Sequence, residues 1–138
     1  MIKIWLQYHT SPLITLDLGA SVADLAWSHY SSSVIVGVTD EGRVHVYDLF
    51  VRKCRPLCVQ NIMQRRRYAL RCVAFSPHHP IILVGGERGY LVTMKLSPNL
   101  RKTHEAPKTT EAEDYNPQKV ERCKMERIIA TTHTSPTQ

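Results

Sequence analysis

VADLAWS at residues 22–28 begins a pattern of three apolar runs that continues with VIVG at 34–37 and GRVHVYDL at 42–49. A second copy follows, with LRCVAFS at 70–76, ILVG at 82–85 and GYLVTMKL at 89–96. The first runs of the two copies are offset by 48 residues and the last runs by 47, so one residue is lost between the copies. A period slightly above about 40 residues is typical of one blade of a β-propeller.

Each run has the length of a β-strand and is bounded by turn-forming residues such as Asp40-Glu41-Gly42. Leu25 and Trp27 lie two positions apart, which places both side chains on one face of a pleated strand. Val73 and Phe75 occupy the same positions in the second copy. The apolar stretch PLCV at 56–59 adds a strand between the copies. Four strands per unit is the count of a propeller blade.

A partial copy precedes these two units. IKIW at residues 2–5 aligns with VHVY at 44–47, and residues 11–18 then supply an outer strand. The chain is therefore expected to start in the middle of a blade. We predict an all-β fold over residues 1–100, a partial β-propeller with about two four-stranded blades plus part of a preceding blade.

The repeated pattern stops after Leu100. Residues 101–119 are rich in Lys, Thr, Glu and Pro and have no apolar period, which favours a flexible linker. A short helix is compatible with residues 117–130, where Val120, Cys123, Ile128 and Ile129 lie loosely on one side. We predict that residues 101–138 form a charged, mostly disordered tail with this weak helix, which needs a partner to stay folded.

The composition is ordinary for a soluble chain. The 138 residues are 43% hydrophobic and 22% charged, with a mean hydropathy of −0.25. No apolar run approaches the roughly 18–20 residues that a membrane span requires, and no secretory signal is visible at the N-terminus. A cytoplasmic, reducing environment is therefore expected, in which the four cysteines are thiols: Cys54, Cys58, Cys72 and Cys123.

The net charge of +6 is unevenly distributed. Residues 1–50 carry two basic and five acidic side chains, residues 51–100 nine and one, and residues 101–138 seven and six. The middle segment therefore has an excess of +8, and Arg65, Arg66 and Arg67 form its densest cluster. This cluster is a candidate contact with an acidic partner, and the alternative is a solvated loop between blades.

No group of residues predicts catalysis, a metal site or a cofactor. His78-His79 with His45, or the pair Cys54 and Cys58, could be considered as metal ligands, but both sets lack the second close ligand pair that structural zinc sites commonly have. No nucleophile elbow is present, and the serines after the first run of each copy are explained by turn formation. GGERG at 85–89 leads into another apolar run, so no helix N-terminus is available to hold a phosphate. We expect a protein without a small-molecule substrate.

The glycine turns and the four-strand units resemble WD40 repeats. Tyr47-Asp48 stands where that family usually has Trp-Asp, whereas Met94-Lys95 and the missing Gly-His motif depart from the pattern. The resemblance implies a repeat-forming role for seven residues: Trp5, Trp27, Gly42, Tyr47, Asp48, Phe75 and Gly89.

Residues 2–102 are similar to the C-terminal part of axonemal dynein intermediate chains, most closely the outer-arm intermediate chain 1 type. The segments that carry the similarity are SVADLAW at 21–27, YSS at 30–32, HPIILVG at 79–85 and LSPNLRK at 96–102. The resemblance implies a non-catalytic scaffold, part of a longer chain, that binds the tail of a dynein heavy chain beside other intermediate and light chains. It also implies a role in dynein arm assembly and ciliary or flagellar movement on axonemal microtubules.

Two other interpretations remain open. One is a WD-repeat adaptor unrelated to dynein, which differs in whether the chain travels with dynein. The other is a basic nucleic-acid-binding module, whose binding would fall steeply with salt and would require Arg65–Arg67. The second is disfavoured because no aromatic stacking platform or reading helix accompanies the arginines.

Overall fold

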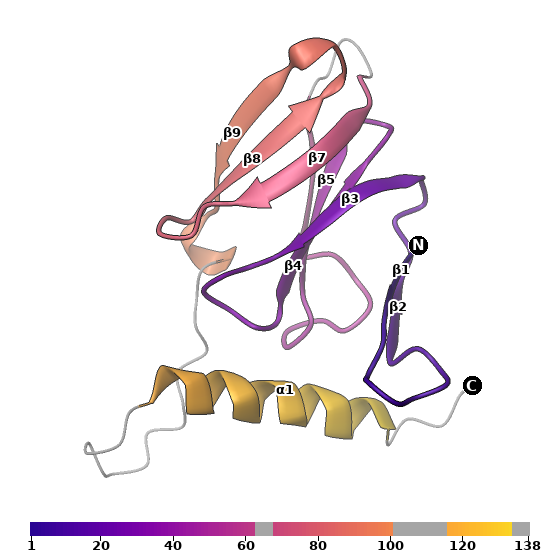
Figure 1. Cartoon of the computed structure of the whole chain (residues 1–138), viewed down its shortest axis with the longest axis vertical. Helices are drawn as coiled ribbons and strands as arrows, with labels where there is room; N and C mark the ends of the chain where they lie inside the picture. The colour runs from indigo at the N-terminus through magenta and orange to yellow at the C-terminus, as the bar shows by residue number, and fades with distance from the viewer. Residues whose placement is uncertain (63–67, 101–115, 134–138) are drawn as a thin grey trace.

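A computed structural model of the chain describes residues 1–62, 68–100 and 116–133. These residues form three antiparallel sheets and one C-terminal helix (Figure 1). The first sheet has the order β1-β2, the second β3-β4-β5-β6 and the third β7-β8-β9. The strands are β1 (Ile2–Ile4), β2 (Ile14–Leu16), β3 (Val22–Trp27), β4 (Val34–Thr39), β5 (Arg43–Asp48), β6 (Cys58–Asn61), β7 (Leu70–Phe75), β8 (Ile81–Gly86) and β9 (Leu91–Lys95). Short 3-10 turns cover Glu87–Gly89 and Pro98–Leu100, and α1 covers Pro117–His133.

The two sequence copies fold as structural copies, even in their irregularities. The register between β3 and β4 shifts between Val22 and Asp24, and the register between β7 and β8 shifts between Leu70 and Cys72. These two bulges lie 48 positions apart, as the sequence offset predicts. A bulge that recurs at the same place in two units indicates that both units have the same repeated structure.

The pairing registers also locate the lost residue. Trp27 pairs with Ile35 and Phe75 pairs with Ile82, so β8 corresponds to β4 with an offset of 47. The residue is therefore lost in the loop before β4 and β8. The sequence alignment that matched Gly37 with Gly85 at an offset of 48 was wrong by one position, because both strands are continuous apolar runs and carry little register information.

Two apolar cores hold the sheets together. The inner face of the β3–β6 sheet packs on the β7–β9 sheet through residues such as Val44, Val46 and Phe75. The opposite face packs on β1 and β2, where Leu16, Ile35 and Tyr47 share the second core with Ile128 of α1. Figure 1 shows the sheets stacked beside one another, with α1 crossing beneath their ends. The four-stranded sheet is therefore the central layer.

The helix is longer and better anchored than its sequence predicts. Asn116 caps its start, because the Asn116 Oδ1 accepts a hydrogen bond of 3.0 Å from the Gln118 N–H. Pro117 at the first helical position suits the fixed φ of proline. Of the tail that was expected to be mostly disordered, residues 101–115 and 134–138 lie outside the described residues.

The fold is mostly β, as predicted, and the first copy has its four strands. The second copy shows three strands, and no strand among the described residues pairs with the outer edge of β9. In the first copy, β6 fills the corresponding place beside β5. The β7–β9 sheet is thus one strand short of the repeat that the sequence defines.

Candidate functional site

The outer face of the β7–β9 sheet is apolar and uncovered. Leu83 and Leu91 occupy the positions of Val36 and Val44, according to the strand pairings. Val36 and Val44 are 0% and 1% exposed, whereas Leu83 and Leu91 are 39% and 66% exposed. The two pairs of residues have the same place in the repeat. Val36 and Val44 pack against the following sheet, β7–β9, whereas no following sheet among the described residues packs against Leu83 and Leu91. This face therefore has the chemistry of an interface between sheets.

The face of the central sheet that lies toward β1–β2 is also partly uncovered. Leu25 and Trp27 on β3 are 41% and 39% exposed, whereas the equivalent Val73 and Phe75 on β7 are each 7% exposed. Phe75 is covered by the preceding sheet, and its ring meets that of Tyr30 edge to face at 6.2 Å between centroids. The sheet before β3 has only two strands, β1 and β2. This two-stranded sheet is too narrow to cover β3.

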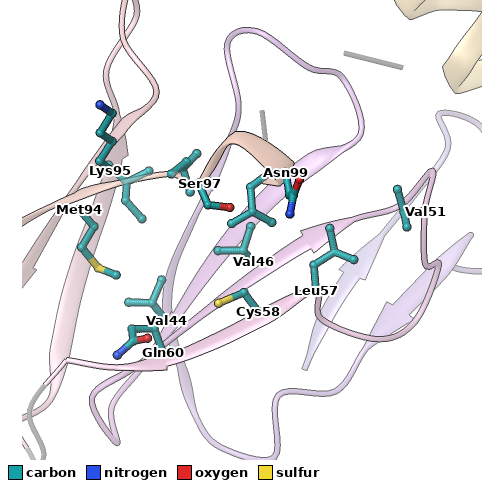
Figure 2. Close-up of a pocket in the computed structure, with 13 residues that line it drawn as sticks. Val44, Val46, Val51, Leu57, Cys58, Gln60, Met94, Lys95, Ser97 and Asn99 are labelled. Carbon is teal, nitrogen blue, oxygen red and sulfur yellow. The ribbon is translucent and has the colours of Figure 1, made fainter. Parts of the chain in front are cut away.

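A groove opens beside the free edge of β9. It has a cavity volume of about 530 Å³ and lies between β5–β6 and β9 (Figure 2). Its apolar lining comes from both sheets and includes Val46, Leu57, Cys58, Met94, Leu96 and Leu100. An extended segment paired with β9 would place alternate side chains in this groove.

Asp48 ends β5 and organises the loops at that end of the sheet. Its Oδ1 accepts hydrogen bonds from the Ser33 Oγ at 2.6 Å and from the Phe50 N–H at 3.0 Å. Ser33 is fully buried and Asp48 nearly so. The bond from a buried hydroxyl to a carboxylate fixes the start of β4 against the end of β5.

Asp24 joins neighbouring sheets near their inner strands. Its Oδ2 accepts a 2.9 Å hydrogen bond from the Val73 N–H of β7, and its Oδ1 accepts one from the Leu25 N–H. Asp24 lies two positions before Ala26, on the face of β3 that packs toward the β7–β9 sheet. The sequence pattern does not predict this role of Asp24, because its partner is 49 positions away and the second copy has Cys72 in its place.

His45 and Tyr47 are polar side chains in the core between the central sheet and β1–β2. Their rings stack with centroids 6.4 Å apart. Neither ring nitrogen of His45 nor the Tyr47 hydroxyl has a hydrogen-bond partner among the described residues. Burial, and then the charge of Arg43, lower the pKa of His45, while burial and the charge of Asp17 raise the pKa of Tyr47. Both side chains are therefore held neutral.

The residues expected to form the repeat are spread over the two units rather than gathered at one site. Tyr47, Asp48 and Phe75 are buried, whereas Trp27 and Trp5 are exposed, Trp5 by 52%. Gly42 and Gly89 both have positive φ, 82° and 74°, as the turns after β4 and β8 require. Their roles in the family pattern stay predictions. Arg65, Arg66 and Arg67 lie outside the described residues.

The described residues offer no metal-binding cluster. Within residues 1–62, 68–100 and 116–133, no three His, Cys, Asp or Glu side chains gather in a way that could hold a metal ion. The helix that the structure describes is too short and too polar to cross a bilayer. The exposed apolar faces are the most distinctive surfaces of this part of the chain.

The fold and its exposed apolar faces define the class of protein. It is a repeat protein built of stacked antiparallel sheets, and its exposed apolar faces are available to pack against further protein segments. Among solved structures, a computationally designed protein named Ika4 has a similar fold, with a TM-score of 0.50 and 16% identity over 69% of this chain and 54% of that one. No family model matches the sequence.

The sequence is homologous to axonemal dynein intermediate chains. It is 42% identical over 136 residues, or 98% of this chain, to ciliary dynein intermediate chain 2 of Heliocidaris crassispina. It is 39% identical over 109 residues to the 78 kDa intermediate chain of the flagellar outer arm of Chlamydomonas reinhardtii, and 38% identical over 112 residues to axonemal intermediate chain 1 of Bos taurus. The chain spans 19%, 16% and 16% of the lengths of these relatives.

Proposed function

We propose that the chain is part of the WD-repeat β-propeller of an axonemal dynein intermediate chain. Its function there is that of a non-catalytic scaffold, which binds the tail of a dynein heavy chain beside other intermediate and light chains. It supports dynein arm assembly and ciliary or flagellar movement, and its place is the axoneme. The homology over nearly the whole chain is the observation that carries this proposal.

The open faces support a propeller rather than a closed two-sheet unit. In a ring of blades every sheet has a neighbour on both sides, and a ring is how β-repeats of this kind avoid exposed faces. Leu25 and Trp27 lack a wide preceding sheet, and no sheet among the described residues follows Leu91. Since the matched relatives are about five times longer than this chain, they have ample length for the missing blades.

The free edge of β9 is the place where such a ring closes. An extended segment from elsewhere in the intermediate chain pairs with β9, as β6 pairs with β5, and fills the groove of Figure 2. Pairing of an added strand along a sheet edge combines main-chain hydrogen bonds with side-chain pockets. Heavy-chain binding then uses the outer surface of the ring and needs no cofactor.

Sedimentation of native dynein tests the proposal. An antibody against residues 103–138 would be used on a high-salt extract of axonemes fractionated on a sucrose gradient. We expect the antigen to sediment with the dynein heavy chains. An antigen that stays away from the heavy chains in the gradient would refute the scaffold function, whatever the fold.

A tagged version of the intermediate chain with Leu91→Lys provides the test of the ring. A lysine buried between blades is costly, so this variant is expected to be lost from the heavy-chain fractions. Val59→Lys is the matched control, because Val59 is also exposed, by 46%, but lies on the outer strand β6. Equal recovery of the two variants would argue against a blade interface at Leu91.

A further inference from the structure

Helix α1 packs against two sheets, β1–β2 and the central sheet, which share one apolar core. Ile128 is buried among residues of β1–β2 and of the central sheet, and Met125 packs at the border of the same core. The residues that Ile128 joins include Ile2 and Leu16 on one side and Ile35 and Leu49 on the other. The helix therefore lies across the junction between the two sheets, as Figure 1 shows.

A polar contact fixes the helix to the loop between β3 and β4. The Glu121 Oε2 accepts hydrogen bonds from the Ser32 N–H at 2.8 Å and from the Ser32 Oγ at 2.5 Å. Burial raises the pKa of Glu121, but the two bonds from Ser32 and the nearby Lys124 outweigh it, so the pKa lies below its ordinary value. The carboxylate is thus ionised, and Ser32 supplies two donors to it.

Lys124 completes the contact one helical turn further along. Its side chain is 5% exposed, and its Nζ donates to the Ser31 Oγ at 2.7 Å, lies 3.6 Å from the Glu121 Oε2 and sits 5.8 Å from the centre of the Phe50 ring. The Ser31 Oγ is in turn 3.3 Å from the Ser33 Oγ, which donates to Asp48. A continuous line of polar contacts therefore runs from α1 to the end of β5.

The position of α1 depends on these few contacts. A helix of 17 residues is marginal in water when it is alone. Its outward side is polar, and the ion pair there, Arg122 with Glu126, is exposed and contributes little. Loss of a strong contact on the inner side therefore weakens the docking of α1.

We propose that α1 is a releasable clamp between the two sheets and that phosphorylation of Ser32 opens it. A protein kinase transfers the γ-phosphoryl group of ATP to the Ser32 Oγ. A P–O bond to serine forms, the bond to the β-phosphate breaks, ADP leaves and the hydroxyl proton passes to the kinase base. The product has lost its hydroxyl donor and carries about −1.5 to −2 charge next to the Glu121 carboxylate.

The charges around Ser32 favour release rather than a tighter contact. Lys124 is the one cation that the described contacts place at this carboxylate, and it is already bound to Glu121 and Ser31. A phosphate would add about −1.5 to −2 charge to a site where Glu121 and Lys124 now balance each other. Since Ser32 is half-buried beneath α1, a kinase reaches it when the helix is open, and the phosphate then prevents re-docking.

Hydrogen exchange of the full 138-residue chain with phosphoserine installed at position 32 tests the clamp. We expect the protection of amides in residues 117–133 to fall by about tenfold or more, while β3–β6 keeps its protection. Phosphoserine at Ser76 is the matched control, because this serine occupies the corresponding loop of the second copy and its Oγ accepts a bond from the His79 N–H. It should leave α1 unchanged.

Glu121→Gln gives an independent readout. This variant has no negative charge at position 121 to repel a phosphate on Ser32. Phosphorylation of Ser32 should therefore lower the hydrogen-exchange protection of α1 by a smaller factor in the variant than in the parent chain. Unchanged or increased protection of α1 in the phosphorylated parent would overturn the proposal, and so would loss of protection throughout the sheets. Absence of phosphate at Ser32 in the protein isolated with phosphatase inhibitors would overturn the modification itself.

Discussion

Gly42 and Gly89 occupy the same turn in the two copies and share a left-handed backbone, yet their surroundings differ. A Cβ on Gly89 would meet nothing within 4 Å, whereas a Cβ on Gly42 would lie 2.9 Å from the Tyr68 carbonyl oxygen. Gly89→Ala should therefore cost about 1–2 kcal/mol of unfolding free energy from backbone strain alone. Gly42→Ala should cost more, because backbone must also move.

Urea unfolding of the two glycine variants measures this difference. The parent chain gives the reference slope of unfolding free energy against urea concentration. A variant with a lower urea midpoint and the same slope has lost stability. Equal losses in the two variants would show that the approach of Tyr68 to Gly42 is not tight in solution.

His45 makes stability depend on pH. Burial and Arg43 lower its pKa in the folded chain below the ordinary 6.5, so the unfolded chain binds the proton more readily. At a pH well above that value, His45 is neutral in both states, and it then adds no pH dependence to the stability. As the pH falls below 6.5, protonation of the unfolded state draws the equilibrium toward unfolding, until the lowered folded pKa is reached.

His45→Leu removes this titration and nearly preserves the side-chain volume. Between about pH 7.5 and about pH 5.5 the parent chain should lose more unfolding free energy than the variant. Denaturant titrations at the two pH values give both losses. Parallel losses in the two proteins would assign the acid sensitivity to other groups.

At the scale of the elements, the bond from Ser33 to Asp48 joins β4 to the end of β5. Ser33→Ala removes a donor from a buried carboxylate and should destabilise the chain by about 1–3 kcal/mol. Ser11→Ala, at an exposed serine, is the control and should have little effect. Thermal unfolding followed by circular dichroism would detect the difference, and indistinguishable midpoints would contradict this role of Asp48.

The sequence was sufficient to predict most strands, because apolar runs and turns recur with the same spacing in both copies. It placed the strand boundaries near Trp27, Gly42 and Phe75 correctly. It also indicated the existence of a helix near residue 117. These features depend on local pattern, and a repeated pattern strengthens each assignment.

The contacts that the sequence did not reveal join residues far apart in the chain. Glu121 and Lys124 meet the loop before β4 across 89 and 93 positions. Both belong to a largely polar helix with only a loose apolar side, so the sequence pattern places Lys124 in a charged tail. Asp24 was missed for a similar reason, since its partner Val73 belongs to the neighbouring sheet.

At the scale of the whole molecule, one open face lies at the end of the stack of sheets, on β7–β9, and the other lies on β3 of the central sheet, beside the narrow β1–β2 sheet. The central sheet is covered on both sides over most of its strands, whereas the β7–β9 sheet is covered on one. The exposed leucines are therefore a consequence of position in the stack rather than of the residues themselves. In isolation such faces tend to associate with other chains.

The 138-residue chain alone should therefore self-associate through the β7–β9 sheet. Leu83→Lys combined with Leu91→Lys places two charges on that face, which should shift the chain toward the monomer without unfolding it, since both side chains already contact solvent. Val59→Lys adds a charge on β6 and should leave association unchanged. Sedimentation velocity over a range of concentrations separates the cases. A parent chain that stays monomeric throughout would mean that some other part of the chain covers this face.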